Sequence, residues 1–227
     1  MLVFVLSSAS SAAEISMFTG GEIDLRSQGF AYLGVDISKS VQEHVLISGR
    51  LVPNYLTYKF PSGDKTVRAT VPGLYVLGGG KLRWSQTSIG LFGGVELKHT
   101  ELNPDVSAKV KGDTLGGIGQ AEVDSWLPTR TNVSGFVSYS GTDGFIYQRA
   151  RVKQQITNLD YQKPNTINLG VEQIFGRNPD FNQIGGGLIA EVYNIPGTMG
   201  FAARGGYKHD STFGSGVYFG IELFKAF

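Results

Sequence analysis

Three histidines, His44, His99 and His209, are the side chains of this sequence whose ordinary pKa values suit acid–base chemistry near neutral pH. Only His44 has a serine close by on the same face of a predicted strand, Ser48, four residues further on. One residue separates the two side chains on that face, whereas a serine nucleophile needs its base within hydrogen-bond distance. The pair gives weak support for a serine hydrolase, and we expect no catalytic residue in this chain.

The other two histidines are expected in solvated segments, His99 beside a loop and His209, with Asp210, in a turn. The sequence has no cysteine, which excludes disulfides and thiolate metal sites, and no histidine–carboxylate cluster has metal-ligand spacing. The glycine runs 78–80 and 185–187 are not phosphate-binding loops, because neither is followed by a Lys-Ser pair or by a predicted helix. We therefore expect neither a metal nor a cofactor.

The strongest chemical signal is a set of charged residues on the polar faces of successive predicted strands. Both signs occur in similar number, so opposite charges can pair across a narrow interior, where an unpaired charge would be costly. If hydrated, the same charges would line a small pore. The predicted lumen-lining residues are Glu22, Asp24, Asp36, Glu96, Glu122, Asp124, Glu172, Glu191 and Glu222, with Arg50, Lys81, Arg83, Lys98, Arg149, Arg151, Lys153, Arg204 and Lys208.

The segments that carry these charges alternate polar and apolar residues, which is typical of strands with two different surroundings. The clearest segment is the last, 214–227, which ends the sequence on an aromatic residue, as the closing strands of bacterial outer-membrane β-barrels do. One face of this segment mixes glycine with Glu222 and aromatic residues. The other face is interrupted only by Lys225, and we expect it to meet membrane lipid through Val217, Phe219, Ile221, Leu223 and Phe227.

About twelve such segments follow Glu14, and an even count places both termini on one side of a closed barrel. Turn-forming residues separate the segments, with the strongest hairpin signal at 141–144 and an expected bulge or kink at Pro72-Gly73. We predict an all-β protein, an antiparallel transmembrane β-barrel formed by one domain, 14–227. Residues 1–13 have an apolar stretch followed by small residues, and they are interpreted as a signal-peptide remnant or a disordered leader.

Net charge and hydropathy indicate which kinds of partner to expect. The formal net charge is +1, which gives no electrostatic case for nucleic acid as a partner. The mean hydropathy of −0.04 is close to zero, and no apolar run reaches the length of a membrane-spanning helix. Strands that alternate lipid-facing and lumen-facing residues give such an average, so outer-membrane lipid is the first expected partner.

Several stretches together resemble one known family. These are the Gly-x-Glu-Ile-Asp pattern at 20–24, the run 29–36, the run 88–96, Leu102-Asn-Pro-Asp105, the glycine-rich stretch 116–122 and the segment 145–151. The glycine and aromatic pattern is similar to that of the cellulose biosynthesis protein BcsS family of alphaproteobacteria, over most of the chain after the leader. The resemblance implies a small barrel in the bacterial outer membrane linked with cellulose production and export, and it carries over no catalytic residue.

The leading prediction is a non-enzymatic outer-membrane barrel that supports exopolysaccharide, in particular cellulose, biosynthesis or secretion. It would act either as a narrow conduit for the glycan chain or by positioning the cellulose synthase and secretion machinery. Two other membrane functions stay open, a general small-solute channel and an outer-membrane lipid hydrolase. A soluble β-protein is the further alternative.

Overall fold

The computed structural model describes residues 13–26, 28–108, 111–157, 165–194 and 196–227 as twelve antiparallel strands in one closed barrel. The strands are β1 Glu14–Asp24, β2 Gly29–Gln42, β3 Val45–Ser62, β4 Lys65–Arg83, β5 Thr87–Asn103, β6 Gly112–Trp126, β7 Thr131–Ser140, β8 Phe145–Gln155, β9 Asn165–Arg177, β10 Asn182–Asn194, β11 Met199–Asp210 and β12 Gly214–Ala226. The barrel predicted from the alternating pattern is confirmed. The predicted leader, 1–13, lies outside the described residues except for Ala13.

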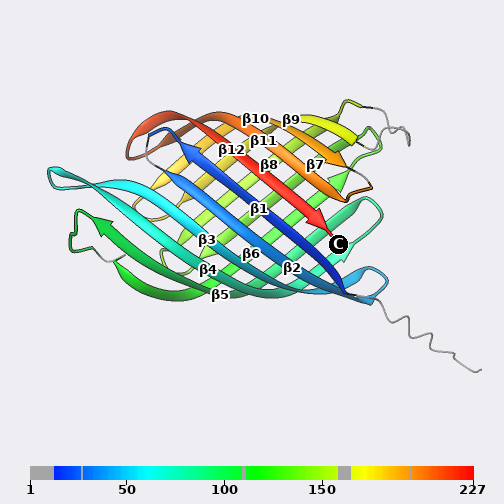
Figure 1. Cartoon of the computed structure of the whole chain (residues 1–227), viewed down its shortest axis with the longest axis horizontal. Coiled ribbons are helices and arrows are strands. Elements are labelled where there is room, and N and C mark those ends of the chain that lie inside the picture. Colours follow the sequence, from blue (N-terminus) through cyan, green and yellow to red (C-terminus); the bar gives the residue numbers. More distant parts are fainter. Residues whose placement is uncertain (1–12, 27, 109–110, 158–164, 195) are drawn as a thin grey trace, which may run out of the picture.

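Each strand pairs with its neighbour in the sequence, and β1 closes the ring against β12 (Figure 1). Because the number of strands is even, β1 begins and β12 ends at the same end of the barrel, which we call the terminal end. The opposite end, which we call the loop end, carries the connections that follow β1, β3, β5, β7, β9 and β11. The longest strands, β3 to β5, extend beyond the others at the loop end (Figure 1).

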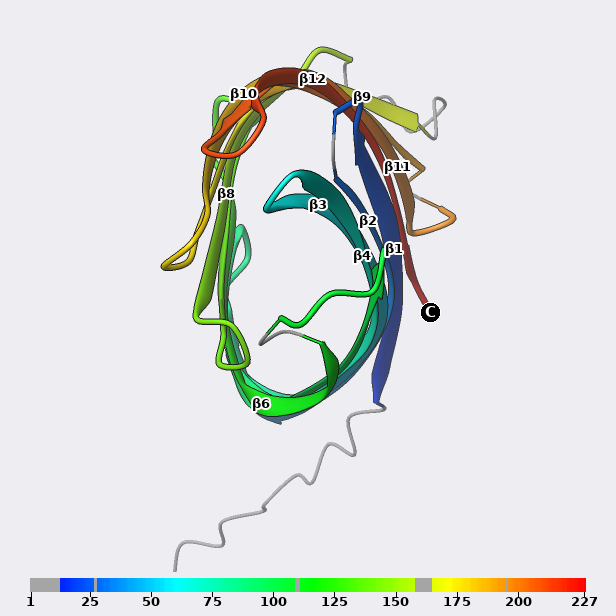
Figure 2. The same ribbon diagram turned by 90° about the vertical axis from the view of Figure 1, so that its left-hand side faces the viewer.

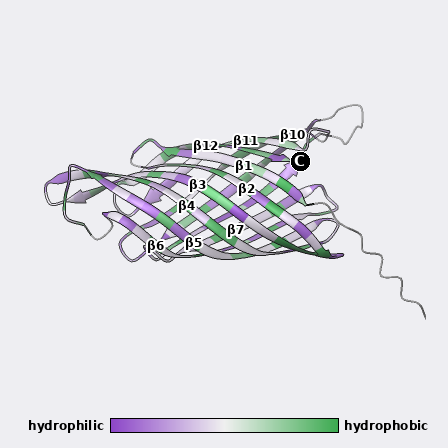
Figure 3. Cartoon of the chain, turned by 60° about the horizontal axis from the view of Figure 1, so that its bottom comes forward, coloured by the Kyte–Doolittle hydropathy of each residue, from purple (hydrophilic) through white to green (hydrophobic). Residues whose placement is uncertain are grey.

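Hydrophobic and hydrophilic positions alternate along the strands (Figure 3), and the exposed, outward-facing positions are largely hydrophobic. Large exposed hydrophobic side chains occur on all twelve strands. Exposed aromatic residues lie toward both ends, with Tyr139 and Tyr207 toward the loop end and Trp84 and Phe227 toward the terminal end. Among the described residues, no helix is long and apolar enough to cross a membrane.

The inner wall carries two apolar clusters besides its charges. The first lies on β3 to β6 and consists of Val52, Leu77, Phe92 and Ile118, with Phe18, Tyr32 and Tyr75 packed against them. Phe18 lies over Gly34, its cross-strand partner, where an added Cβ atom would be 2.1 Å from the ring. A glycine at this position therefore gives the aromatic ring its place on the inner wall.

The second cluster, which we call the loop-end cluster, is formed where β3 to β5 extend past the rest of the ring. Its buried members are Val67, Ala69, Val71 and Leu102, and Leu56, Tyr58, Phe60, Val106 and Ala108 pack against them. Val106 and Ala108 belong to the connection between β5 and β6, which folds back across the mouth of the barrel (Figure 2). The cluster therefore covers the inner face of a sheet that has no opposite wall at this level.

Of two local predictions, the structure contradicts one in part and the other fully. No bulge occurs at Pro72-Gly73, because Thr70 opposite Glu101 and Gly73 opposite Lys98 keep one register on both sides of the proline. The proline interrupts the ladder without an inserted residue. His209, predicted in a turn, lies within β11, because this strand continues to Asp210.

Candidate functional site: the charged lumen

The predicted charged residues all lie within strands, and most of them alternate with exposed apolar residues, which places their side chains on the inner side of the wall. Most of them are buried or half-buried and paired with one another. The exceptions lie at the terminal end: Arg83 pairs with Glu14 at 2.9 Å where both are exposed, and the exposed Asp124 accepts a hydrogen bond from Asn132. The paired residues form two networks on different parts of the wall.

The first, which we call the Arg50 network, joins β2, β3, β4 and β6. The Arg50 guanidinium donates to Asp36 at 3.0 Å and to both carboxylate oxygens of Glu122 at 3.1 Å. Lys81 donates to the same Asp36 carboxylate at 3.0 Å. Two carboxylates thus meet two cations, and Arg50 connects strands that are separated in the ladder by β4 and β5.

Two aromatic rings lie close to the guanidinium of this network. The Arg50 guanidinium carbon lies 4.0 Å from the centroid of the Phe92 ring and 5.4 Å from that of Phe18. A cation over a ring face is attracted by the ring's quadrupole, and the attraction strengthens where water is excluded. The Arg50 side chain is only 8% exposed, so it is held by carboxylates and rings and has little contact with solvent.

The second, which we call the Arg204 network, joins β1, β8, β9, β11 and β12. Arg204 contacts three carboxylates, Glu22 at 2.6 Å, Glu172 at 3.1 Å and Glu222 at 3.3 Å. Its side chain is 4% exposed and that of Glu172 is fully buried. The Tyr218 hydroxyl donates a hydrogen bond to Glu172 at 2.8 Å, so this carboxylate has both a tyrosine and an arginine as partners.

Two arginines of β8 extend the Arg204 network across the lumen. Arg149 donates to Glu222 at 2.6 Å, and Arg151 donates to Glu222 at 2.7 Å and to Glu172 at 3.0 Å. Strands β9, β10 and β11 separate β8 from β12 in the ladder, so these contacts join distant parts of the ring. The charge pairing that the sequence suggests as one possibility is therefore present across the lumen as well as between nearby strands.

Lys208 completes this network near the loop end. It lies 2.5 Å from Glu22 and 3.7 Å from Asp24, so that four cations of the network meet four carboxylates. Equal numbers of opposite charges also occur in the Arg50 network. Each network is neutral by itself, which is the condition for burying charge in a narrow lumen.

The remaining predicted charges form two smaller groups. Lys98 lies 3.2 Å from Glu96 and 3.3 Å from Asp143, a residue of the turn between β7 and β8 that the sequence did not single out. Lys153 donates to Glu191 at 2.7 Å. Asp143 was missed because its residue type and its position in a turn give no sign that the turn folds inward.

The histidines do not form the serine–histidine site considered from the sequence. Ser48 faces inward and lies 2.6 Å from the Ser38 hydroxyl, whereas His44 is exposed in the turn after β2. A different pair, His209 and Ser215, lies on the outer surface with a distance of 3.0 Å between Nδ1 and Oγ. No carboxylate is within hydrogen-bond distance of His209 among the described residues, so the pair has no group to orient the imidazole.

The closing strand β12 has two different faces. Val217, Phe219, Ile221, Leu223 and Phe227 are all exposed on the outer surface, with Phe227 at 72%. Tyr218 and Glu222, which alternate with them, belong to the Arg204 network. Among the described residues, no group of His, Cys, Asp and Glu is placed to hold a metal ion.

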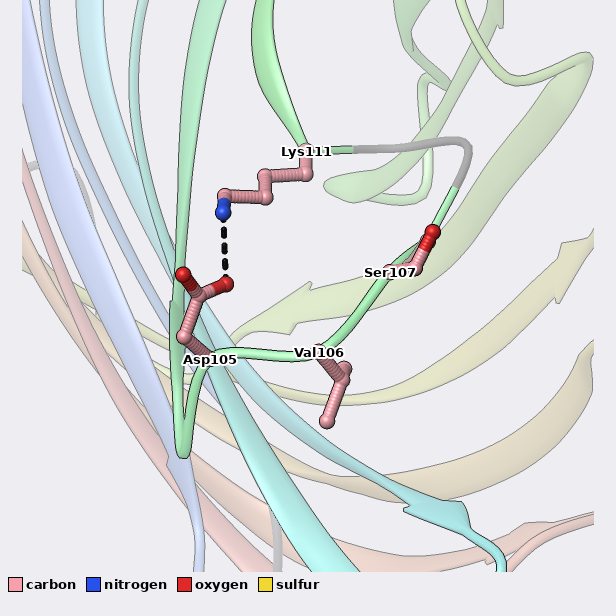
Figure 4. A pocket seen from close by; sticks show the side chains of 5 residues that line it. Asp105, Val106, Ser107 and Lys111 are labelled. Carbon is pink, nitrogen blue, oxygen red and sulfur yellow. Dashed lines mark hydrogen bonds and ion pairs between the residues drawn. The ribbon is translucent and has the colours of Figure 1, made fainter.

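The connection between β5 and β6 forms an open pocket outside these networks. It is lined by Asp105, Val106, Ser107, Ala108 and Lys111. The Lys111 ammonium donates to the Asp105 carboxylate at 2.5 Å across the base of the connection (Figure 4). Both side chains are exposed, so this ion pair is a surface contact of the loop end.

The shape of the chain is that of outer-membrane barrels. It is similar to the β domain of the Bordetella autotransporter BrkA, with 12% identity, a TM-score of 0.61 and coverage of 96% of this chain and 99% of the other. An outer membrane channel from Pseudomonas putida F1 has 8% identity, a TM-score of 0.54 and full coverage of both chains. The translocator domain of NalP from Neisseria meningitidis has 12% identity and a TM-score of 0.53, with coverage of 97% and 90%. At these identities the similarity shows the fold alone.

Sequence comparison identifies the family. No curated protein sequence matches the chain. The model of the cellulose biosynthesis protein BcsS family, however, matches residues 16–227, which is the whole barrel apart from the first residues of β1. The chain therefore belongs to the cellulose biosynthesis protein BcsS family.

Proposed function

We propose that this chain is a non-enzymatic outer-membrane barrel that supports cellulose biosynthesis and secretion without conducting the polymer through its own lumen. The observation that carries the proposal is the pairing of the lumen charges. Arg50 and Arg204 hold carboxylates from several strands, and both side chains are almost fully buried. A hydrated solute or a glycan chain would have to separate these ion pairs to pass, and separating a buried pair is costly.

The surface of the barrel supports placement in the outer membrane. The outward-facing residues of β3 from Val45 to Tyr55 carry no charge, and this length matches the roughly 9–11 residues of a tilted transmembrane strand. In bacterial single-chain barrels the short turns face the periplasm and the longer loops face outward. The loop end has the projecting strands β3 to β5 and the connection 104–111, so it would face the cell exterior and the terminal end the periplasm, although the terminal end also has a long connection, 156–164.

With a closed lumen, the contribution to cellulose production would come from the two ends of the barrel. The turns of the terminal end would meet the secretion machinery in the periplasm. The loop end, where β3 to β5 project beyond the ring (Figure 1), would meet the emerging glycan or a partner outside. The barrel would in this way hold the synthase and secretion machinery in position at the membrane.

Single-channel conductance in a planar bilayer tests the closed lumen. We expect refolded wild-type barrel to give no steady conductance, with or without soluble cello-oligosaccharides. Arg50→Ala removes the side chain that joins β3 to β6 and should give a measurable conductance, because the carboxylates of Asp36 and Glu122 lose their partner and attract water and cations. Lys39→Ala, an exposed residue on the outer surface, is the matched control and should stay silent.

Each alternative has a distinct outcome that would overturn the proposal. Steady wild-type conductance interrupted by the sugars would establish a glycan conduit, and conductance indifferent to them a general channel. Release of fatty acid from phospholipid vesicles by wild type, but not by Ser215→Ala, would establish a lipid hydrolase. In cells, deletion should lower the cellulose yield and wild type should restore it, and an unchanged yield would contradict a role in cellulose production.

A further inference from the structure

Two cations lie directly opposite each other on the outer surface near the loop end. Lys59 of β3 and Arg68 of β4 are cross-strand partners. Arg68 is exposed and alternates with Val67 and Ala69, which are fully buried on the inner side, so the Arg68 side chain points outward. Like charges in directly opposite positions of an antiparallel pair repel and destabilise the sheet.

The described part of the chain supplies no counter-ion for this pair. Neither Lys59 nor Arg68 makes a hydrogen bond or an ion pair with any described residue, although nearly all the cations of the lumen are paired. The acid nearest along the ladder is Glu101, opposite Thr70, and its contact is with His99 at 3.7 Å. The repulsion between the two cations is therefore uncompensated within the protein.

The position of the pair indicates what could compensate it. Along the outward face of β3, uncharged residues extend to Tyr55, and Thr57 and Lys59 follow. On β4, Tyr55 lies opposite Pro72, and Thr70 and Arg68 follow in the same direction. The two cations thus lie one pair of threonines beyond the apolar surface, at the level where the headgroups of the surrounding lipids begin.

We propose that Lys59 and Arg68 together bind a phosphate group of a phosphorylated lipid in the leaflet at the loop end, an inference that rests on the proposed placement in the outer membrane. Arginine presents a planar set of donors that fits phosphate oxygens, and lysine adds a second charge. A lipid is favoured over free phosphate because Tyr55, Pro72 and Leu74 continue from the cations as apolar surface along which acyl chains can lie. The phosphate removes the repulsion that the protein leaves uncompensated.

Thermal unfolding in two surroundings tests this site. In a neutral detergent, Lys59→Ala and Arg68→Ala should leave Tm unchanged or raise it, because each removes the repulsion. In phosphatidylcholine vesicles containing diphosphorylated lipid A, wild type should gain Tm relative to vesicles with the same lipid lacking its phosphates. The double variant should lose most of that gain. Arg177→Ala is the matched control, since it removes an exposed loop-end cation that has no cation opposite it.

Several results would overturn the proposal. One is a loss of Tm in the variants that is equal in neutral detergent and in lipid A vesicles, which would indicate a purely structural role. Another is a wild-type gain that does not depend on the lipid phosphates. A third is an equal gain from inorganic phosphate in detergent, which would mean a site for free anions. The proposed function would fail separately, through conductance or an unchanged cellulose yield, with the Tm shifts unaffected.

Discussion

The interior of this barrel is filled by two different kinds of contact, ion pairs around Arg50 and Arg204 and apolar packing in the loop-end cluster. Both are built from the inward-facing residues of the same alternating strands. Val67 and Ala69 have no exposed surface, and neither does the Glu172 side chain in the Arg204 network. Side chains are therefore buried to the same extent in both regions, by paired charged groups in the Arg204 network and by apolar packing in the loop-end cluster.

The difference follows from the walls that surround each region. Within the closed ring, a charge on one strand finds a partner on another, as Arg149 of β8 does with Glu222 of β12. At the loop end only β3 to β5 continue, and an inward-facing charge there would have no opposite wall to supply its partner. Apolar residues can be covered by any apolar surface, and Val106 and Ala108 of the following connection provide it.

The largest effect should come from removing Arg204. Arg204→Met leaves Glu22, Glu172 and Glu222 with one cation fewer in a buried site, and breaking such a pair costs about 3–5 kcal/mol of unfolding free energy. Urea unfolding in lipid vesicles measures the loss. The charge-balanced double variant Arg204→Met with Glu172→Gln should recover part of it, and a single variant as stable as wild type would show that the network does not stabilise the fold.

The loop-end cluster should respond differently to a comparable change. Leu102→Ala should cost about 2–3 kcal/mol, the lower part of the range for large-to-small core changes, because a site at the edge of the fold can relax. The loss should be independent of salt concentration and should be accompanied by faster proteolysis in the connection between β5 and β6. A loss that shrinks with added salt would mean that charges, and not apolar packing, hold this region.

The smallest effect is expected at the exposed ion pair of the same connection. Lys111→Ala removes the contact with Asp105, where both side chains are largely in solvent, and should change the unfolding free energy by about 0–1 kcal/mol. This variant is the reference for Arg204→Met, since both variants remove an ion pair but the pair of Lys111 is exposed and that of Arg204 is buried. A loss as large as that of Arg204→Met would indicate that burial does not set the energy of these pairs.

Alternation along the sequence was enough to predict the barrel and its strand number, and it indicated a polar and an apolar face for most strands. Period-two patterns identify the two faces of a strand wherever one face is apolar, as in Val217 to Leu223. The pattern does not identify partners. Arg50 meets Glu122 only because β3 and β6 curve around the same lumen, and this depends on the register and twist of the strands between them.

Two local features could not be predicted from the sequence: the inward fold of the turn that contains Asp143, and the way in which the ladder accommodates Pro72. Asp143 lies in a turn, and the inward fold of that turn depends on its contacts with Lys98 and with neighbouring hydroxyl groups. Of the bulge or kink expected at Pro72-Gly73, the bulge does not occur, because a proline can also be accommodated by a missing ladder contact with no change of register. The sequence pattern does not show whether a strand proline is accommodated by an inserted residue or by a missing ladder contact.

The contacts of Glu22 have a consequence for how the ring is assembled. Glu22 is on β1, and its partners Arg204 and Lys208 are on β11, with β12 between them. These ion pairs therefore exist only after the first and last strands of the chain have met, and an unclosed sheet would have two free edges open to pairing with other chains. Glu22 therefore stabilises the closed ring from the inner side of the seam between β1 and β12, and it contributes nothing to a sheet that has not yet closed.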